Sequence, residues 1–532
     1  MQVHKTRKRT LTLYSVGTIT AHQTLYVCPQ CGYISQSREL AALAPARHTF
    51  GYDVMVYVGE AVFRHFSTDQ EVKSHLRERG ITISASEVAL LAKKYMCYLA
   101  SAHRESQALL KKHLVAQGGY ILHLDGTCDG DSTHLFVGLD ELSSLVLDAM
   151  KLPSEKSEII IPFLKELERT YGTPVALVHD MGAGILHAVD EVFPHIPDYI
   201  CHFHFLRDIG KDLFMGEHQR IQKRFRYYGI QTKLRAILKQ CVPVVNAHPQ
   251  ELQELTTSIT GSSWKVNTSL SPELLLYTLI HWAFAGKKQK DGYGFPFDRP
   301  YMVFFERLRK LKATIYKLRL HQQSSVAESV LTVLQPLWYD QQLITAEKRL
   351  HEKVNVFEQL RCAMSIAEPG GIYGLNDQGS GTIQTIEAQV TEFYQQLITH
   401  EDQYQGNEYR KMRKQIEKYW KRLFAAPIQV MQQGQTVLLY PQRTNNILEQ
   451  FFRSMKHAHC RKSGYARMYK SINAMLSVTP LVKNLDQPDY LKLILNGCSS
   501  LEERFAQIDS SVVQKLLAEE AQSTQFVDPK IK

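Results

Sequence analysis

The chain of 532 residues has no uninterrupted apolar stretch of about 20 residues, the length that a membrane-spanning helix needs. Its basic first residues, 1–9, are not followed by the apolar core of a secretory signal peptide. Cysteine is sparse, and nine residues spread along the sequence do not form the disulfide framework of a small secreted domain. We therefore expect a cytoplasmic protein with reduced thiols and no membrane partner.

Tandem repeats and low-complexity tracts are also missing, and the composition, 44% hydrophobic and 22% charged, is that of an ordinary globular protein. The length corresponds to two to four domains. Lysine and arginine number 63 against 53 acidic residues, which gives a net charge of +10. This charge suits a polyanionic partner, although many proteins of this size carry it without binding nucleic acid.

Within residues 1–50, the segment 11–35 alternates in the way typical of short strands and leads to the turn C-P-Q-C-G with Cys28 and Cys31. Two thiolates at this spacing converge on one metal ion, so the turn predicts a zinc knuckle. Zinc needs four ligands and no second C-x-x-C follows; the candidates for the remaining positions are His22, His48 and Cys97. The alternative is a degenerate knuckle whose cysteines only pack.

Residues 51–115 predict a helix-turn-helix segment. A helix over 52–66 precedes two more, which begin at expected capping boxes over 67–70 and 84–87, and a turn at Gly80 separates these two. The last helix extends to about residue 99 and carries Lys93 and Lys94, which we expect to contact DNA. A plain helical hairpin is the alternative.

A mixed sheet is expected between residues 119 and 204. Three antiparallel strands precede a helix, a buried strand, a second helix and a last strand; the expected ranges are 120–125, 133–140, 145–152, 155–170, 175–180, 182–193 and 198–204. This is the element order of a ribonuclease-H-like α/β fold. Right-handed crossovers lay the later strands parallel to the first, on its far side.

Two carboxylates end strands of this predicted sheet. Asp125 and Asp180 each close an apolar run, and they should lie at the same edge of neighbouring strands, where open α/β sheets place their sites. Because Asp is also frequent in turns and at helix starts, each residue alone is weak evidence. Competitors for the first position are turn residues: Asp129, Asp131 and Asp140.

A third acid, Glu449, lies far along the chain in a predicted helix over 444–460, and it shares one face of this helix with Arg453 and Lys456. On its own it could form only a surface ion pair with Arg453. Three carboxylates of this kind can hold two Mg²⁺ ions, which together activate the attacking oxygen and stabilise the leaving one in phosphodiester chemistry. The long spacing requires a helical domain that interrupts the sheet domain, and the basic, helical residues 215–436 fit that role.

Cys201 and His204 form a C-x-x-H pair on the last expected strand, with His202 between them. The pair could bind zinc or brace the active site, or it could be a buried thiol beside a hydrogen-bonded imidazole. A zinc hydrolase using all three residues is disfavoured, because alternation along a strand points Cys201 away from His202.

These motifs together resemble those of the DDE transposases of insertion sequences, in particular the Mutator-like group and its bacterial relatives. The matching segments are L-D-G-T at Asp125, L-V-H-D at Asp180, C-x-x-H at Cys201 and His204, and residues 443–449 ending in Glu449, followed by Lys456 and Gly464. They span roughly residues 20–470. Two departures are the missing second ligand pair of the knuckle and the long gap before Glu449.

The resemblance implies nicking at element ends that depends on Mg²⁺ or Mn²⁺, followed by attack of the 3′-hydroxyl on target DNA. It implies Arg453 and Lys456 on the phosphate backbone, double-stranded DNA as the partner, a nucleoid-associated homodimer or larger assembly, and zinc in the knuckle. Alternatives are a nuclease of the same fold and a silent DNA-binding protein. The expected parts are 1–50 (knuckle), 51–115 (helix-turn-helix), 116–214 and 437–475 (catalytic core), 215–436 (helical insertion) and 476–532 (helical tail).

Overall fold

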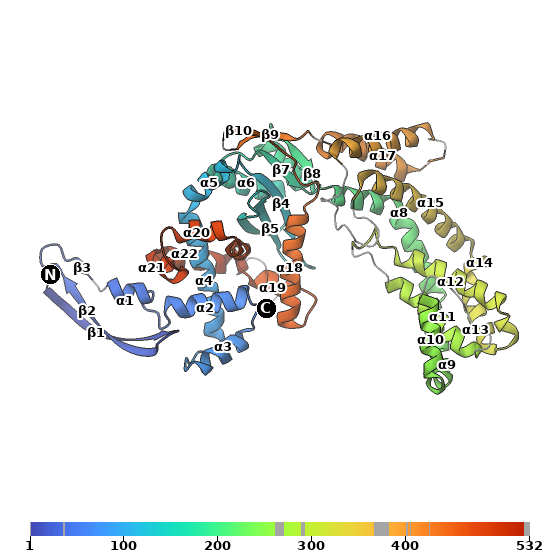
Figure 1. The fold of residues 1–532 in the computed structure, drawn as a ribbon, viewed down its shortest axis with the longest axis horizontal. Helices are drawn as coiled ribbons and strands as arrows, with labels where there is room; N and C mark the ends of the chain where they lie inside the picture. The colour runs from blue at the N-terminus through green and yellow to red at the C-terminus, as the bar shows by residue number, and fades with distance from the viewer. Residues whose placement is uncertain are drawn as a thin grey trace. The chain divides into compact units, whose positions relative to one another are not determined.

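The computed structural model describes residues 2–35, 38–260, 271–288, 293–366, 382–400, 403–404, 406–424, 426–432 and 434–525. The chain forms two compact units (Figure 1). The first contains Met1–Cys201 and Ala425–Lys532, and the second contains His202–Phe424. A helical unit thus interrupts the first unit, with boundaries at 202 and 424 where the sequence suggested 215 and 436.

A five-stranded mixed sheet is the centre of the first unit. Its strand order is β6-β5-β4-β7-β8. The strands are β4 (Ile121–Thr127), β5 (His134–Asp140), β6 (Val146–Leu152), β7 (Ala176–His179) and β8 (Asp198–Ile200). β4, β5 and β6 pair antiparallel, whereas β7 and β8 add in parallel on the far side of β4. The predicted strand order and directions are confirmed.

Two helices connect the parallel strands, α6 (Ser157–Tyr171) and α7 (Ala183–Val192). α6 is amphipathic, with Ile160, Leu164 and Leu167 in the core at helical spacing. The last strand is shorter than expected. β8 ends at Ile200 and helix α8 begins at His202, so the prediction of a strand to residue 204 is wrong. The apolar run continues past Ile200 because the first turn of α8 is also buried. Periodicity in so short a run cannot distinguish a buried strand from a buried helix.

The N-terminal residues form a small sheet with a core of its own. β1 (Gln2–Leu13) pairs antiparallel with β2 (Gly17–Val27), which also pairs with the short β3 (Ile34–Ser35). Leu11 and Leu13 pack with residues of α1 (Arg38–Leu43) in a separate apolar cluster. The strands were expected, but they begin earlier than residue 11.

Helices α2 (Tyr52–Phe63), α3 (Asp69–Glu78), α4 (Ala85–Glu105) and α5 (Gln107–Ala116) follow. The capping box of α3 is formed by Thr68 and Glu71, one residue later than predicted, and Ser84 caps α4. The turn between α3 and α4 contains Gly80 at φ +75°, a conformation that favours glycine. From Tyr95 to His103 every residue of α4 is buried, so this half of the helix is a core element.

The C-terminal residues complete this core rather than forming a tail. η3 (Thr479–Asp486), α20 (Pro488–Leu495) and α21 (Leu501–Gln507) bury Leu481, Tyr490 and Phe505 in the same apolar cluster as α4 and the sheet. α22 (Ser510–Gln525) also packs on α4. The segment over 476–532 was expected to be a helical tail; its described residues are helical, and their apolar side chains fill the space beside α4.

Between the helical unit and this C-terminal segment the chain returns to the first unit. β9 (Ile428–Gln432) and β10 (Gln435–Leu439) form a hairpin whose turn contains Gly434 at φ +80°. Helix α18 (Asn446–Ser463) and the short α19 (Tyr469–Ala474) follow. Leu448 and Phe451 anchor α18 in the core.

The second unit is entirely helical over its described residues. Its helices are α8 (His202–Tyr227), α9 (Ile230–Ala247), α10 (Pro249–Thr260), α11 (Pro272–Lys288), α12 (Pro300–Lys317), η1 (Leu320–Gln322), α13 (Ser325–Leu334), α14 (Pro336–Tyr339), α15 (Gln341–Met364), α16 (Ile383–Thr399) and α17 (Asn407–Leu423). Buried Lys353 binds Glu217 and Glu408, each at 3.0 Å, and so joins α15 to α8 and α17.

Two cations of the basic segment 215–436 are held within this unit. Arg224 pairs with Asp340 and lies over Tyr227, and Arg307 donates to the carbonyl oxygen of Trp282 at 2.6 Å. The glycine-rich stretch over 368–381, expected to be a loop, lies outside the described residues. No helix among the described residues is long and apolar enough to cross a membrane.

Candidate active site

Asp125 lies near the end of the central strand β4. Only 6% of its surface is exposed. The backbone N–H of Gly126 donates to its Oδ1 at 2.8 Å. In the parallel pair of β4 and β7, Leu124 is opposite His179. Asp125 and Asp180 therefore follow matched positions at the same edge of the sheet, as the sequence predicted.

Helix α18 brings Glu449 to this edge, and Asn445 fixes the start of the helix. The side chain of Asn445 donates through Nδ2 to the carbonyl oxygen of Leu124 at 2.9 Å. Its Oδ1 lies 2.9 Å from Nδ1 of His123, on the same strand. The backbone N–H of Glu449 donates to the carbonyl oxygen of Asn445 at 2.9 Å. Glu449 thus stands one helical turn beyond a residue that is bound to β4 beside Asp125.

The electrostatics of Asp125 show that the three acids are neighbours. The pKa of Asp125 lies well above its ordinary value, first because burial disfavours the charged carboxylate and then because the charges of Asp180 and Glu449 repel it. The N–H of Gly126 opposes this rise. Three carboxylates from a strand end, a second strand end and a helix start therefore act on one another, although they are far apart in the sequence.

The hydrogen-bonded pair of His179 and Asp198 supports the backbone at Asp180. His179 lies in β7, with Nε2 2.6 Å from Oδ1 of Asp198 on β8. Burial alone would lower the pKa of His179, but the hydrogen bond and the charge of Asp198 outweigh it and raise that pKa. The other ring nitrogen, Nδ1, lies 2.5 Å from the carbonyl oxygen of Asp180. Nδ1 therefore fixes the backbone that carries Asp180, and Nε2 fixes the ring to Asp198 on β8.

A fourth acid, Glu155, was not anticipated. Its carboxylate lies beside Gly126, where an added Cβ would stand 2.7 Å from Oε1, and its charge contributes to the raised pKa of Asp125. His134 holds it through Nδ1 at 2.9 Å. Helix α7 approaches this loop so closely that a Cβ on Gly184 would lie 1.9 Å from the carbonyl oxygen of Glu155. Nothing in the local sequence around Glu155 signals this contact.

The donor set suits a hard divalent cation. Carboxylate oxygens are the ligands that Mg²⁺ prefers, and a cation would relieve the repulsion at Asp125. Within the part of the chain that the structure describes, no three acidic, histidine or cysteine side chains already surround one point. Bound metal would therefore have to draw Asp125, Asp180 and Glu449 closer together.

Two of the three competing acids have structural roles. Asp140 is fully buried and accepts hydrogen bonds from the backbone of Ile121, Leu142 and Ser143. Asp129 accepts from the backbone N–H of Met468 at 2.5 Å. These bonds occupy both carboxylates in turns, which agrees with the preference for Asp125.

The C-x-x-H pair is divided between the two units. Cys201 ends the first unit; its backbone donates to the carbonyl oxygen of His179 at 2.8 Å, and its sulfur accepts from the backbone N–H of Asn445 at 3.3 Å. His204 belongs to the second unit, where burial lowers its pKa to about 3 and keeps it neutral. His202 lies 2.9 Å from the carbonyl oxygen of Leu423. Cys201 thus braces the start of α18, and its bond to Asn445 gives no support to a zinc hydrolase.

A backbone hydrogen bond closes the turn that contains Cys28 and Cys31. Gly32, at φ +70°, donates to the carbonyl oxygen of Cys28 at 2.9 Å. Backbone hydrogen bonds from Cys31, then from Gln30, lower the pKa of the Cys28 thiol and favour the thiolate that zinc binds. Cys97 is buried in the core, where burial raises its pKa to about 12 and favours the neutral thiol. No third ligand group joins Cys28 and Cys31 within the described residues, and zinc remains a prediction.

The predicted DNA contacts are partly accessible. Lys93 is exposed on α4, whereas Lys94 is half-buried, and burial lowers its pKa. Arg453 and Lys456 are exposed on α18, one and two turns beyond Glu449 on the same face. Neither makes an ion pair with any described residue. Cations free of protein partners beside an acidic site suit a phosphate backbone.

No family model and no curated protein sequence matches the chain. Among solved structures, a chain of the Drosophila P element transposase strand transfer complex is similar, with a TM-score of 0.35 and 12% sequence identity. The similarity covers 88% of this chain and 97% of that one. A similarity of this degree establishes neither a fold family nor a function.

Proposed function

We propose that this protein is a DNA transposase of the DDE type, with a ribonuclease-H-like core, that cuts at the ends of its element and joins the freed 3′-hydroxyl to target DNA. The observation that carries the proposal is the position of Asp125. It is buried at the end of the central strand, and its pKa is raised first by this burial and then by the charges of two further acids from separate elements, Asp180 and Glu449.

Carboxylates gathered in such a place cost stability, because burial removes the hydration of Asp125 and the charges of Asp180 and Glu449 repel it. An acidic cluster that serves only the fold has no reason to keep three mutually repelling members, whereas one that binds Mg²⁺ or Mn²⁺ does. When bound, two such ions would activate the attacking oxygen and stabilise the leaving one. Asp125, Asp180 and Glu449 would hold them.

The remaining residues position these groups and the DNA. Asn445 and Cys201 hold α18 on β4, and the pair of His179 and Asp198 holds the backbone of Asp180. Arg453 and Lys456 would neutralise phosphates beside Glu449. Double-stranded DNA is the proposed partner, with a homodimer or larger assembly on paired ends and zinc at Cys28 and Cys31.

The test is a cleavage assay with the full chain, Mn²⁺ or Mg²⁺, and DNA carrying the flanks of its own gene, resolved on a denaturing gel. We expect metal-dependent nicks at the ends that are lost in Asp125→Ala, Asp180→Ala and Glu449→Ala. Asp131→Ala removes an exposed acid in a nearby turn and should leave the nicks intact.

Two outcomes would reassign the protein. Cleavage without joined products in the presence of target DNA would indicate a nuclease of the same fold. Tight DNA binding without cleavage in either metal would indicate a silent DNA-binding protein. A fully active Glu449→Ala enzyme would refute the triad itself.

A further inference from the structure

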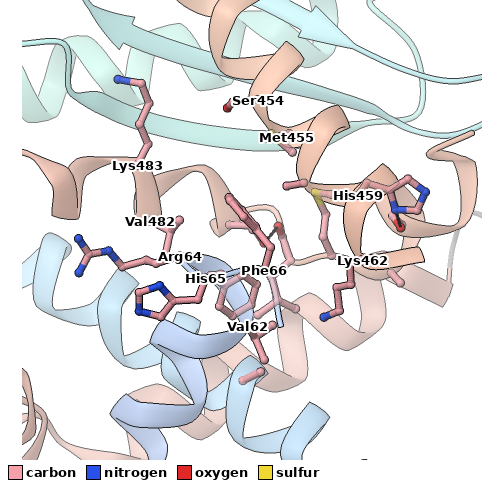
Figure 2. A pocket seen from close by; sticks show the side chains of 18 of the residues that line it. Val62, Arg64, His65, Phe66, Ser454, Met455, His459, Lys462, Val482 and Lys483 are labelled. Carbon is pink, nitrogen blue, oxygen red and sulfur yellow. Dashed lines mark hydrogen bonds between the residues drawn. The ribbon is translucent and has the colours of Figure 1, made fainter. Parts of the chain in front are cut away.

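A large pocket lies between helix α18 and the N-terminal helices of the first unit (Figure 2). Its volume is about 670 Å³, within the range of small-molecule sites. The walls come from the C-terminal end of α2 and the residues that follow it, and from the first half of α4. Helices α18, α19 and η3 complete them. None of the acids of the candidate active site lines it, so the pocket is a separate feature of the same unit.

The lining combines an apolar floor with a basic rim. Val62, Phe451 and Met455 are among the apolar side chains, and Lys93, Lys462 and Arg64 are among the cations. The two acids of the rim are already paired: Asp486 with Arg64 at 3.1 Å and Asp69 with Lys462 at 3.6 Å. Lys93 is exposed and has no ion-pair partner among the described residues. The rim therefore has a positive charge that the protein does not balance.

Phe66 is the unusual residue of this pocket. It follows α2 with φ at +57°, a conformation that bulky residues rarely adopt, and 37% of its surface is exposed. In Figure 2 it lies between Arg64 and His65 on one side and Lys462 on the other. Strained conformations of this kind cluster at binding sites, where the surrounding structure holds them. The backbone holds this one through the bond from the N–H of Ser67 to the carbonyl oxygen of Ala61, at 2.9 Å.

Phe66 also connects the pocket to the active-site side of α18. A second hollow, lined by Phe66, Gln450, Arg453, His457 and Arg461, shares Ser454 and Ala458 with the first. At 1.5 Å per residue, the pocket residues Ser454 to Lys462 lie roughly 8–20 Å along the helix from Glu449. That is the length of a few nucleotides of extended strand, and exposed cations, Arg453 and Arg461, line the way.

We propose that this pocket takes an unpaired base of the DNA strand processed at the active site, stacked on Phe66, with its phosphates at Lys93, Arg461 and Lys462. An exposed aromatic face beside cations is the arrangement that binds single-stranded nucleic acid, because every base has a face that stacks and every phosphate a charge. An apolar peptide would use the floor but not the unbalanced charge of the rim. The inference rests on the proposed function, in that DNA is the ligand.

The test measures binding of the full chain in EDTA, where no cleavage occurs. The probe is a hairpin duplex with a three-nucleotide single-stranded tail that carries 2-aminopurine, and the control probe is the same duplex with a blunt end. We expect wild type to bind the tailed probe roughly 5- to 100-fold more tightly and to quench its fluorescence, as stacking of one base would. Phe66→Ala should abolish the preference and the quenching, and Phe66→Tyr should keep both.

Phe66→Leu keeps an apolar side chain without the aromatic face, so it separates lost stacking from a collapsed pocket. Tyr339→Ala removes an aromatic residue of α14 that is more exposed than Phe66, 73% against 37%, and should change nothing. Equal affinity of wild type for the two probes, or an unchanged preference in Phe66→Ala, overturns the proposal. Self-association that depends on Phe66 and is not displaced by the tailed probe would instead make this face a protein interface, which also overturns it.

The proposed function fails by a different result. If wild type binds the tailed probe but never cuts DNA in Mn²⁺ or Mg²⁺, the transposase assignment is wrong and the base pocket stands. If wild type cuts DNA and shows no tail preference, the pocket inference is wrong and the transposase assignment stands.

Discussion

The side chain of Asn445 donates to the carbonyl oxygen of Leu124 at 2.9 Å, one residue before Asp125 on the central strand. The same side chain meets His123 at 2.9 Å, and the backbone of Asn445 meets the sulfur of Cys201 at 3.3 Å. All these groups are buried. The helix that carries Glu449 is therefore bound to the strand that carries Asp125 by polar contacts that leave little freedom for its first turn.

Asn445→Ala should lower cleavage strongly while leaving DNA affinity nearly unchanged, because Glu449 would lose its fixed position but every cation that faces phosphate would remain. Buried partners without a hydrogen bond also cost about 1–3 kcal/mol, so the free energy of unfolding should fall by that order. Activity, DNA affinity and denaturant unfolding are the three measurements. Asn446→Ala, one residue on and only half-buried, is the control and should behave as wild type.

Asp125→Asn should raise the melting temperature in EDTA by a few degrees while abolishing cleavage. Burial and the neighbouring acids raise the pKa of Asp125 above its ordinary value of about 3.9. The metal-free fold therefore loses stability as the pH rises from that ordinary value towards the raised pKa of the folded state. A neutral amide removes this loss and the repulsion from Asp180 and Glu449. Mg²⁺ should raise the melting temperature of wild type but not of the variant. A variant that melts lower than wild type in EDTA would contradict the strained acidic cluster.

His103 predicts a second pH dependence, in the core of the first unit. Its Nδ1 lies 3.0 Å from the hydroxyl of Tyr490, and its Nε2 lies 3.1 Å from the carbonyl oxygen of Leu147 and 2.7 Å from the hydroxyl of Tyr171. Burial, the main cause, lowers its pKa to about 4. The neutral ring thus joins α4 to α20, β6 and α6.

Because the folded state resists protonation of His103 and the unfolded state does not, stability should fall as the pH drops from about 6.5 to about 4. The full loss is on the order of 3 kcal/mol for this group alone. Chemical denaturation at a series of pH values measures it. His103→Gln should be less stable than wild type at neutral pH yet flatter across this window; a slope equal to that of wild type would show that other groups cause the loss.

How much of this could be predicted from the sequence depends on the range of each interaction. The strand order and the positions of Asp125 and Asp180 follow from apolar runs that end in acids, which is local information. The buried bonds of Asn445 and the contact of Glu155 with the site join residues from separate segments, and no local pattern records them. The prediction of a strand to residue 204 was wrong for a related reason. The buried first turn of a helix, here the turn that begins at His202, has the same kind of apolar sequence as a buried strand.

The half of α4 beyond Lys94 illustrates a second limit. The sequence predicted that this helix contacts DNA through Lys93 and Lys94. The residues that follow, from Tyr95 to His103, lie in the core because the C-terminal helices cover them. Only the first half, with Lys93, remains available. The local pattern predicted the helix but not how many neighbours would pack around it, since Tyr490 and Phe505 come from the far end of the chain.

Arg453 and Lys456 should contribute to DNA affinity through charge alone. Replacing either with alanine should weaken binding of duplexes of any sequence and reduce the slope of log affinity against log salt by about one for each phosphate that the protein no longer neutralises. Fluorescence anisotropy over a range of salt concentrations measures that slope. Lys112→Ala removes an exposed lysine from α5, which lines neither hollow beside α18, and should leave the slope unchanged. An unchanged slope in both α18 variants would mean that the DNA does not follow this helix, and the cations that neutralise its phosphates would then have to be sought elsewhere.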